Sequence, residues 1–173
     1  MGNIYKFIII VLLFSGCSSA TEEQANKQQY FFDIAGYFER QASTLKGKKI
    51  IKTVSKNETS ETKTLTIENW EQELQLFTDA DINKAAWKNS YKKDSTANKL
   101  TYTTSDPELR VKNISIEFKN SKPAKLVINT ESENLLYHTK EMLLFIPDSV
   151  YQITKHQKVF LLGLSNYSIT GKF

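Results

Sequence analysis

Cysteine is nearly absent from this sequence, because Cys17 is the only one among 173 residues. One thiol can neither close an internal disulfide nor build a cysteine-based zinc site, so disulfide scaffolds and zinc ribbons are excluded. Proline (3) and glycine (6) are also scarce, which excludes a low-complexity chain. The remaining composition, 40% hydrophobic and 24% charged, is typical of one globular domain.

Glycine-rich loops are missing as well. After position 16 the glycines are Gly36, Gly47, Gly163 and Gly171, and they are too dispersed to form a phosphate-binding loop. The formal net charge of +4 is too small to indicate a nucleic-acid partner. Lysines that protect the edges of a sheet account for this charge, and attraction to anionic lipid headgroups is the alternative.

A long apolar run is absent, but a short one lies at residues 7–14, directly after Lys6. A membrane-spanning helix needs about 20 apolar residues, so this run is too short to span a bilayer. A basic start, a short apolar run and then small residues are typical of a signal peptide, which we place at residues 1–16.

Ser15, Gly16 and Cys17 end that run, and the motif resembles the lipobox of bacterial lipoproteins. The resemblance implies cleavage before Cys17 and attachment of this residue to the membrane by diacylglycerol. Phe14 departs from the family, which usually has leucine there. Residues 17–29 are polar and predict a flexible tether. Ser18 and the acidic pair at 22–23 resemble the sorting and export signals of outer-membrane lipoproteins in Bacteroidetes, with the membrane face left open.

The folded part begins with helical spacing over residues 30–45, where Phe31, Ile34, Phe38, Ala42 and Leu45 recur every three or four positions. Residues 49–56 and 61–67 predict a hairpin, and 69–78 a second short helix. Strands are then expected at 87–93, 99–104, 110–119, 124–128, 135–146, 150–164 (one strand or two) and 167–173, with a bulge near Val111.

Strands at hairpin spacing cannot form a parallel sheet, which needs long crossovers. We therefore predict a single α+β domain over residues 30–173. Its N-terminal amphipathic helix packs on a curved, mostly antiparallel sheet of about eight to ten strands, and the second short helix lies between strands 2 and 3.

Few residues suggest chemistry. Asp79, Asp81 and Asn83 match the first ligand positions of a calcium loop, but Lys84 and Ser90 replace its glycine and its bidentate carboxylate. A helix or turn cap is the better interpretation. His138 and His156 could share a distant glutamate as metal ligands, but two histidines on strand surfaces are the better interpretation. We therefore expect no metal, no cofactor and no catalytic residues.

A broader resemblance rests on Ala80-Asp81-Ile82-Asn83-Lys84 with Trp87 and Tyr91, on Leu100-Thr101-Tyr102, and on Asn134-Leu135-Leu136-Tyr137. These motifs resemble small uncharacterised lipoproteins of Bacteroidetes, a family without a known activity. Exported proteins of that group are commonly O-glycosylated at Asp followed by Ser or Thr. The resemblance therefore implies Ser95 and Ser149 as O-glycosylation sites.

Two functions are compatible with these features. The first is a non-enzymatic binding module for an apolar ligand or lipid, because the chain is rich in aromatic and aliphatic residues. The alternative is an envelope structural or interaction protein with a filled core and a protein or polysaccharide partner; a hydrolase is the least supported. The candidates for a ligand groove, or for the core, are Phe118, Leu126, Ile128, Tyr137, Leu144 and Phe160.

Overall fold

The structure is a computed structural model that describes residues 29–173. The predicted signal peptide at 1–16, the lipidation site Cys17 and the tether up to residue 28 lie outside the described residues.

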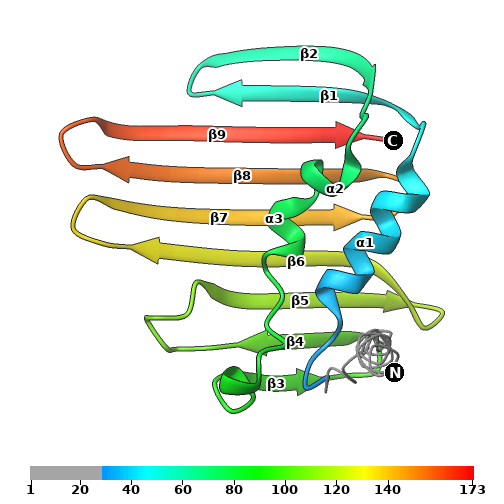
Figure 1. The fold of residues 1–173 in the computed structure, drawn as a ribbon, viewed down its shortest axis with the longest axis vertical. Coiled ribbons are helices and arrows are strands. Elements are labelled where there is room, and N and C mark those ends of the chain that lie inside the picture. Colours follow the sequence, from blue (N-terminus) through cyan, green and yellow to red (C-terminus); the bar gives the residue numbers. More distant parts are fainter. Residues whose placement is uncertain (1–28) are drawn as a thin grey trace, which may run out of the picture.

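Nine strands form one open antiparallel sheet (Figure 1). They are β1 (Lys49–Lys56), β2 (Thr59–Thr66), β3 (Lys92–Ser95), β4 (Lys99–Thr103), β5 (Val111–Lys119), β6 (Lys122–Glu133), β7 (Tyr137–Ile146), β8 (Val150–Val159) and β9 (Gly163–Lys172). Their order is β2-β1-β9-β8-β7-β6-β5-β4-β3, so β2 and β3 are the edges. The predicted antiparallel sheet is confirmed, and the 150–164 segment divides between β8 and β9.

Three helices lie over one face of this sheet (Figure 1): α1 (Ile34–Leu45), α2 (Trp70–Glu73) and α3 (Gln75–Thr78). Asp33 begins α1, because its carboxylate accepts a hydrogen bond from the Gly36 N–H at 2.9 Å. Gly47 follows the helix with φ +76°, a conformation that suits glycine. The single helix predicted over 69–78 is instead two short helices, interrupted at Leu74.

Two details of the predicted strands have opposite outcomes. The bulge near Val111 is confirmed, because the register of β5 against β6 shifts between Val111 and Asn113. The strand predicted from Trp87 is wrong. Trp87 ends a short 3-10 helix (Ala85–Trp87), and β3 begins only at Lys92.

The core lies between the helices and the sheet. Phe38 of α1 packs against Phe77 of α3, with ring centroids 4.6 Å apart, and against Phe145 of β7 at 5.1 Å. Leu126 is paired with Phe145 across β6 and β7, and both are fully buried. Side chains on alternate strand positions fill the rest of this layer, so the space under α1 is occupied by protein.

Asn83 holds the segment that enters α1. Its Oδ1 accepts the Tyr30 and Phe31 N–H groups at 3.0 and 2.9 Å, and its Nδ2 donates to the Phe32 carbonyl at 3.1 Å. The Tyr102 hydroxyl accepts the Phe32 N–H at 3.0 Å. We call this set of bonds the Asn83 clamp.

We expect Phe38→Ala to lower the free energy of unfolding by about 3–5 kcal/mol, because it removes a buried aromatic and leaves a cavity beside the rings of Phe77 and Phe145. Urea denaturation of residues 29–173 measures the change. A loss below about 1 kcal/mol would contradict the packing of α1 on the sheet.

We expect Asn83→Ala to lower the free energy of unfolding by about 2–4 kcal/mol, because the buried Phe31 N–H loses its acceptor. Asn113→Ala is the matched control. It removes one hydrogen bond to the Tyr102 carbonyl and should cost about 1 kcal/mol or less. Equal costs for the two variants, measured by the same denaturation, would show that the clamp adds nothing.

Candidate functional site

The six candidate groove or core residues do not line one groove. Leu126 and Ile128 are 0% exposed and belong to the core. Phe118 packs beside Phe32, with ring centroids 6.4 Å apart. Leu144 alternates with the buried Leu143 and Phe145, so it lies on the face of β7 away from the helices.

Tyr137 and Phe160 are brought together, in a place that the sequence did not indicate. They lie at the ends of the β6–β7 and β8–β9 hairpins, which project side by side from one end of the sheet (Figure 1). Both line a shallow hollow of about 230 Å³ between the two turns.

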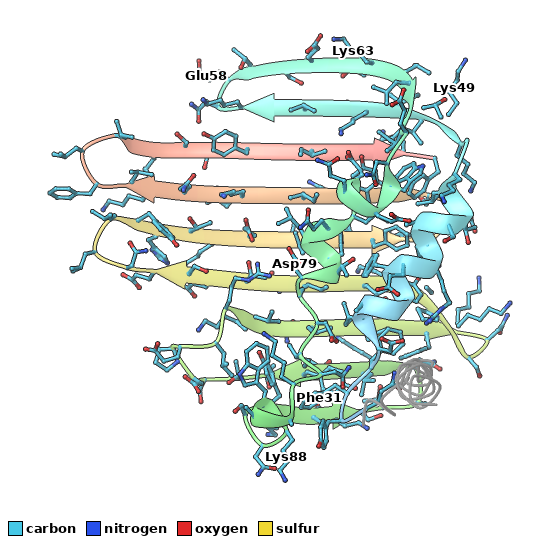
Figure 2. The ribbon with its side chains drawn as sticks, in the orientation of Figure 1. Phe31, Lys49, Glu58, Lys63, Asp79 and Lys88 are labelled. Carbon is cyan, nitrogen blue, oxygen red and sulfur yellow. The ribbon has the colours of Figure 1, made fainter. Side chains whose placement is uncertain are left out.

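These two hairpin ends carry most of the exposed apolar surface. Seven of the ten large hydrophobic side chains exposed in the described chain lie here. We call this set the tip patch: Leu135, Leu136, Tyr137, Phe160, Leu161, Leu162 and Leu164. Exposure is greatest for Leu135 (97%) and Leu161 (89%) and least for Tyr137 (39%). By contrast, the charged residue Glu58 stands at the end of the β1–β2 hairpin (Figure 2).

One hydrogen bond joins the two hairpin tips, and others stabilise the β6–β7 turn. The Phe160 N–H donates to the Leu136 carbonyl at 2.8 Å, which joins the two hairpins. The Asn134 side chain accepts the Leu136 and Tyr137 N–H groups at 2.8 and 3.0 Å. The patch is therefore a defined surface, and several of its backbone donors are satisfied by the protein.

Leu161 occupies a backbone position that disfavours it. Its φ is +68°, whereas the other non-glycine residues with positive φ in the described chain are Asn, Ser or Asp. The left-handed conformation costs roughly 1–2 kcal/mol for a residue with a large side chain, and asparagine or glycine adopts it more easily. An apolar side chain thus stands on a turn where a polar residue would be more stable.

Charged side chains of both signs stand at the base of the patch. His138 Nε2 lies 2.6 Å from Glu131 Oε1, and Lys140 Nζ lies 3.2 Å from the same oxygen. The hydrogen bond from His138, followed by that from Lys140, holds the pKa of Glu131 below its usual value. Lys158 and Glu133 line the hollow itself.

A partly buried carboxylate lies between the tips and the core. Glu141 of β7 accepts a hydrogen bond from the Thr130 hydroxyl at 2.9 Å and pairs with Arg110 at 3.3 Å. Lys155 lies 3.7 Å from its other oxygen. Beyond this polar row the helices no longer cover the sheet, so the tip side chains have no protein layer above them (Figure 1).

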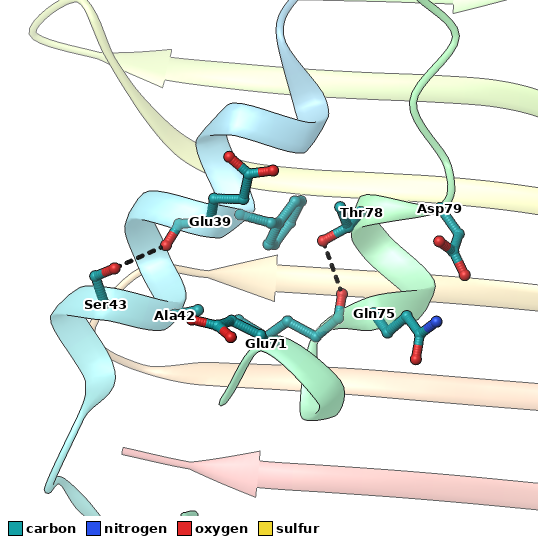
Figure 3. Close-up of a pocket in the computed structure, with 9 residues that line it drawn as sticks. Glu39, Ala42, Ser43, Glu71, Gln75, Thr78 and Asp79 are labelled. Atoms are coloured by element: carbon teal, nitrogen blue, oxygen red, sulfur yellow. Dashed lines mark hydrogen bonds between the residues drawn. The ribbon is translucent and has the colours of Figure 1, made fainter. Parts of the chain in front are cut away.

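A larger groove of about 580 Å³ lies between α1 and the short helices (Figure 3). Its floor consists of buried core side chains, and Glu39, Glu71 and Asp79 stand on its rim. The Ser43 and Thr78 hydroxyls bond to the Glu39 and Leu74 carbonyls, as helix hydroxyls often do. Histidine is absent from the described residues that line this groove.

The residues considered for calcium have structural roles. Asp79 is the C-cap of α3, and Asp81 accepts a hydrogen bond from the Asn83 side chain at 3.2 Å. The cap interpretation fits these positions, and Asn83 forms the clamp. His156 bonds to Asn166 at 2.7 Å, while His138 bonds to Glu131. Within residues 29–173, no three His, Cys, Asp or Glu side chains are grouped so that they could hold a metal ion.

The two O-glycosylation candidates are both exposed. Ser149 lies in the turn between β7 and β8, as expected. Ser95 is the last residue of β3, at the edge of the sheet, where a turn was expected.

Five residues of the tip patch were missed by the sequence analysis: Leu135, Leu136, Leu161, Leu162 and Leu164. The pair Leu135 and Leu136 and the pair Leu161 and Leu162 were both assigned to strands, because apolar runs favour strands. The available signal was the position of each pair directly between two strand patterns, where turn residues are normally polar.

Compared with protein-family models, curated proteins and solved structures, the chain matches none. Among the described residues, no helix has the length and apolar character needed to cross a bilayer.

Proposed function

We propose that this chain is a lipid-anchored, non-enzymatic binding protein of the cell envelope that holds an apolar partner on the tip patch. The observation that carries the proposal is the concentration of seven exposed apolar side chains on two hydrogen-bonded turns. Exposed apolar clusters of this kind usually mark interaction surfaces.

The filled interior supports an external binding surface. Phe38, Phe77 and Phe145 occupy the space between helices and sheet where an acyl chain would otherwise lie. The hollow between the tips, about 230 Å³, is smaller than typical small-molecule sites of about 300–1,000 Å³. The proposal thus combines an apolar partner with the filled core of the alternative hypothesis.

The envelope location is part of this proposal. It is supported by the lipobox resemblance at residues 15–17 and by the resemblance to Bacteroidetes lipoproteins. Two or more acyl chains on Cys17 would give stable attachment to the outer membrane, because a single chain holds a protein only reversibly. O-glycosylation of Ser95 and Ser149 is compatible with their exposure.

Cys17→Ser should abolish incorporation of a palmitate analogue in cells and should either release the protein from membranes or leave its signal uncut. The reason is that no other cysteine is present to accept the lipid. Ser19→Ala is the control and should be labelled like the wild type. Labelling of Cys17→Ser at the wild-type level would refute the anchor.

Replacing Leu135, Leu161 and Leu162 by serine in residues 29–173 should weaken retention on phenyl-agarose. These three side chains represent about 5–9 kcal/mol of apolar transfer free energy if fully buried. The control replaces Ile51 and Val54, which are also exposed but lie in β1, by serine. Equal shifts in elution for the two variants would show that the tips are not the binding surface.

A further inference from the structure

We propose that the partner of the tip patch is the surface of a phospholipid bilayer, into which the two hairpin tips insert. This inference rests on the proposed function and names the apolar partner. It is carried by the shape of the patch, the polarity along it and the hydrogen bonds of its backbone.

The two hairpin ends project from the sheet (Figure 1), and the polarity of their side chains changes along the strands. Leu135, Leu161 and Leu162 are 83–97% exposed at the ends of the turns. Tyr137, the least exposed member, opens β7, and Lys158 precedes the β8–β9 turn. From the turns inward, the most exposed leucines are therefore followed by Tyr137 and then by Lys158, which is level with Leu164 of the patch. This order matches the passage from hydrocarbon through the interface to the headgroups, where tyrosine is enriched.

Several N–H groups of the tip backbone are already paired within the protein. The N–H groups of Leu136 and Tyr137 donate to the Asn134 side chain, and that of Phe160 donates to the Leu136 carbonyl. The Leu162 N–H donates to the Val159 carbonyl at 3.2 Å. Inside a bilayer an unpaired backbone group is costly, so loops that enter it must satisfy their own donors.

A bilayer fits these observations better than one bound lipid molecule. The hollow between the tips holds about 230 Å³, and five of the seven side chains are more than 66% exposed. A fluid layer can surround projecting side chains, whereas a single ligand needs a concave site. The base of the patch carries both signs of charge, with Lys158 and Lys140 beside Glu131 and Glu133. We therefore expect binding to zwitterionic lipid that depends little on salt.

The chain between Cys17 and the domain is long enough for the lipid and the tips to enter the same membrane. Phe32 is bonded to Tyr102, which is level with Ile128 across β4, β5 and β6. The seven residues from Ile128 to Leu135 span about 23 Å along the sheet. The covalent chain from Cys17 to residue 29 can extend to about 40 Å. A lipid on Cys17 and the inserted tips can therefore occupy the same membrane, which gives two points of attachment.

The test uses the full chain, purified with whatever lipid Cys17 carries and reconstituted into phosphatidylcholine vesicles with or without brominated acyl chains. Tryptophan is placed at the tip by Leu162→Trp, and at a control site by Ile51→Trp, which is also exposed. The unsubstituted chain gives the background from Trp70 and Trp87. Brominated lipid should quench the added tip fluorescence about twofold or more beyond the control, because an inserted side chain sits about 5–10 Å into the interface.

Two further measurements sharpen the test. Quenching should persist from about 0.1 M to about 1 M NaCl, since exposed charge pairs are screened over that range and apolar insertion is not. Adding Leu161→Asn to the Leu162→Trp chain should reduce quenching while the thermal unfolding temperature stays equal or rises, because asparagine suits the positive φ of that turn. The unfolding temperature of each variant shows that it is still folded, so that reduced quenching reports reduced insertion.

Quenching of Leu162→Trp no greater than that of Ile51→Trp would overturn the bilayer as partner. If retention on phenyl-agarose still depended on the tips, the proposed function would stand, and a protein would be the partner. If retention were also independent of the tips, both proposals would fail. Quenching lost at high salt would likewise overturn apolar insertion.

Discussion

The contact of Phe38 with Phe77 and Phe145 is the interaction on which the other features depend, because it packs the helices onto the sheet. The sheet extends well beyond the area that the helices cover. A helix of 12 residues is about 18 Å long, and strands lie about 4.8 Å apart, so α1 can cross about four strands. It crosses them near one end (Figure 1). The far ends of β6–β9 extend beyond the covered area, and the exposure of the tip patch follows from this difference in length.

Two partly buried carboxylates mark where the covered layer ends. At one side, Glu73 of α2 accepts the Tyr151 hydroxyl hydrogen bond at 2.5 Å and pairs with Lys52 at 2.7 Å. Burial, with the neighbouring Glu73, raises the pKa of Tyr151, so this hydroxyl remains a donor at ordinary pH. Tyr151 can lie across β9 only because its partner there is Gly171, where a Cβ would meet the tyrosine ring. At the other side Glu141 has the same role with Arg110 and Lys155, so polar networks bound the apolar core on both sides.

The sequence predicted the antiparallel sheet well because its signals are local. The out-of-phase Val111 produces the bulge in β5, and polar turns separate most strands. Trp87 and the leucines of the tips were assigned to strands because composition cannot distinguish an apolar turn from an apolar strand. The pairing of β1 with β9 joins residues more than a hundred positions apart and has no local signal. The tip patch depends on the register of two hairpins and on the limited reach of α1, so the sequence alone could not locate it.

The Asn83 clamp also decides how the domain carries mechanical force. A pull on residue 29 meets hydrogen bonds from the side chains of Asn83 and Tyr102 before it meets α1. Tyr102 lies in β4, which is paired on both sides, so the force is shared by neighbouring strands. A domain held at its N-terminal side in a moving fluid would keep its hydrophobic layer closed until the hydrogen bonds of Asn83 and Tyr102 both broke.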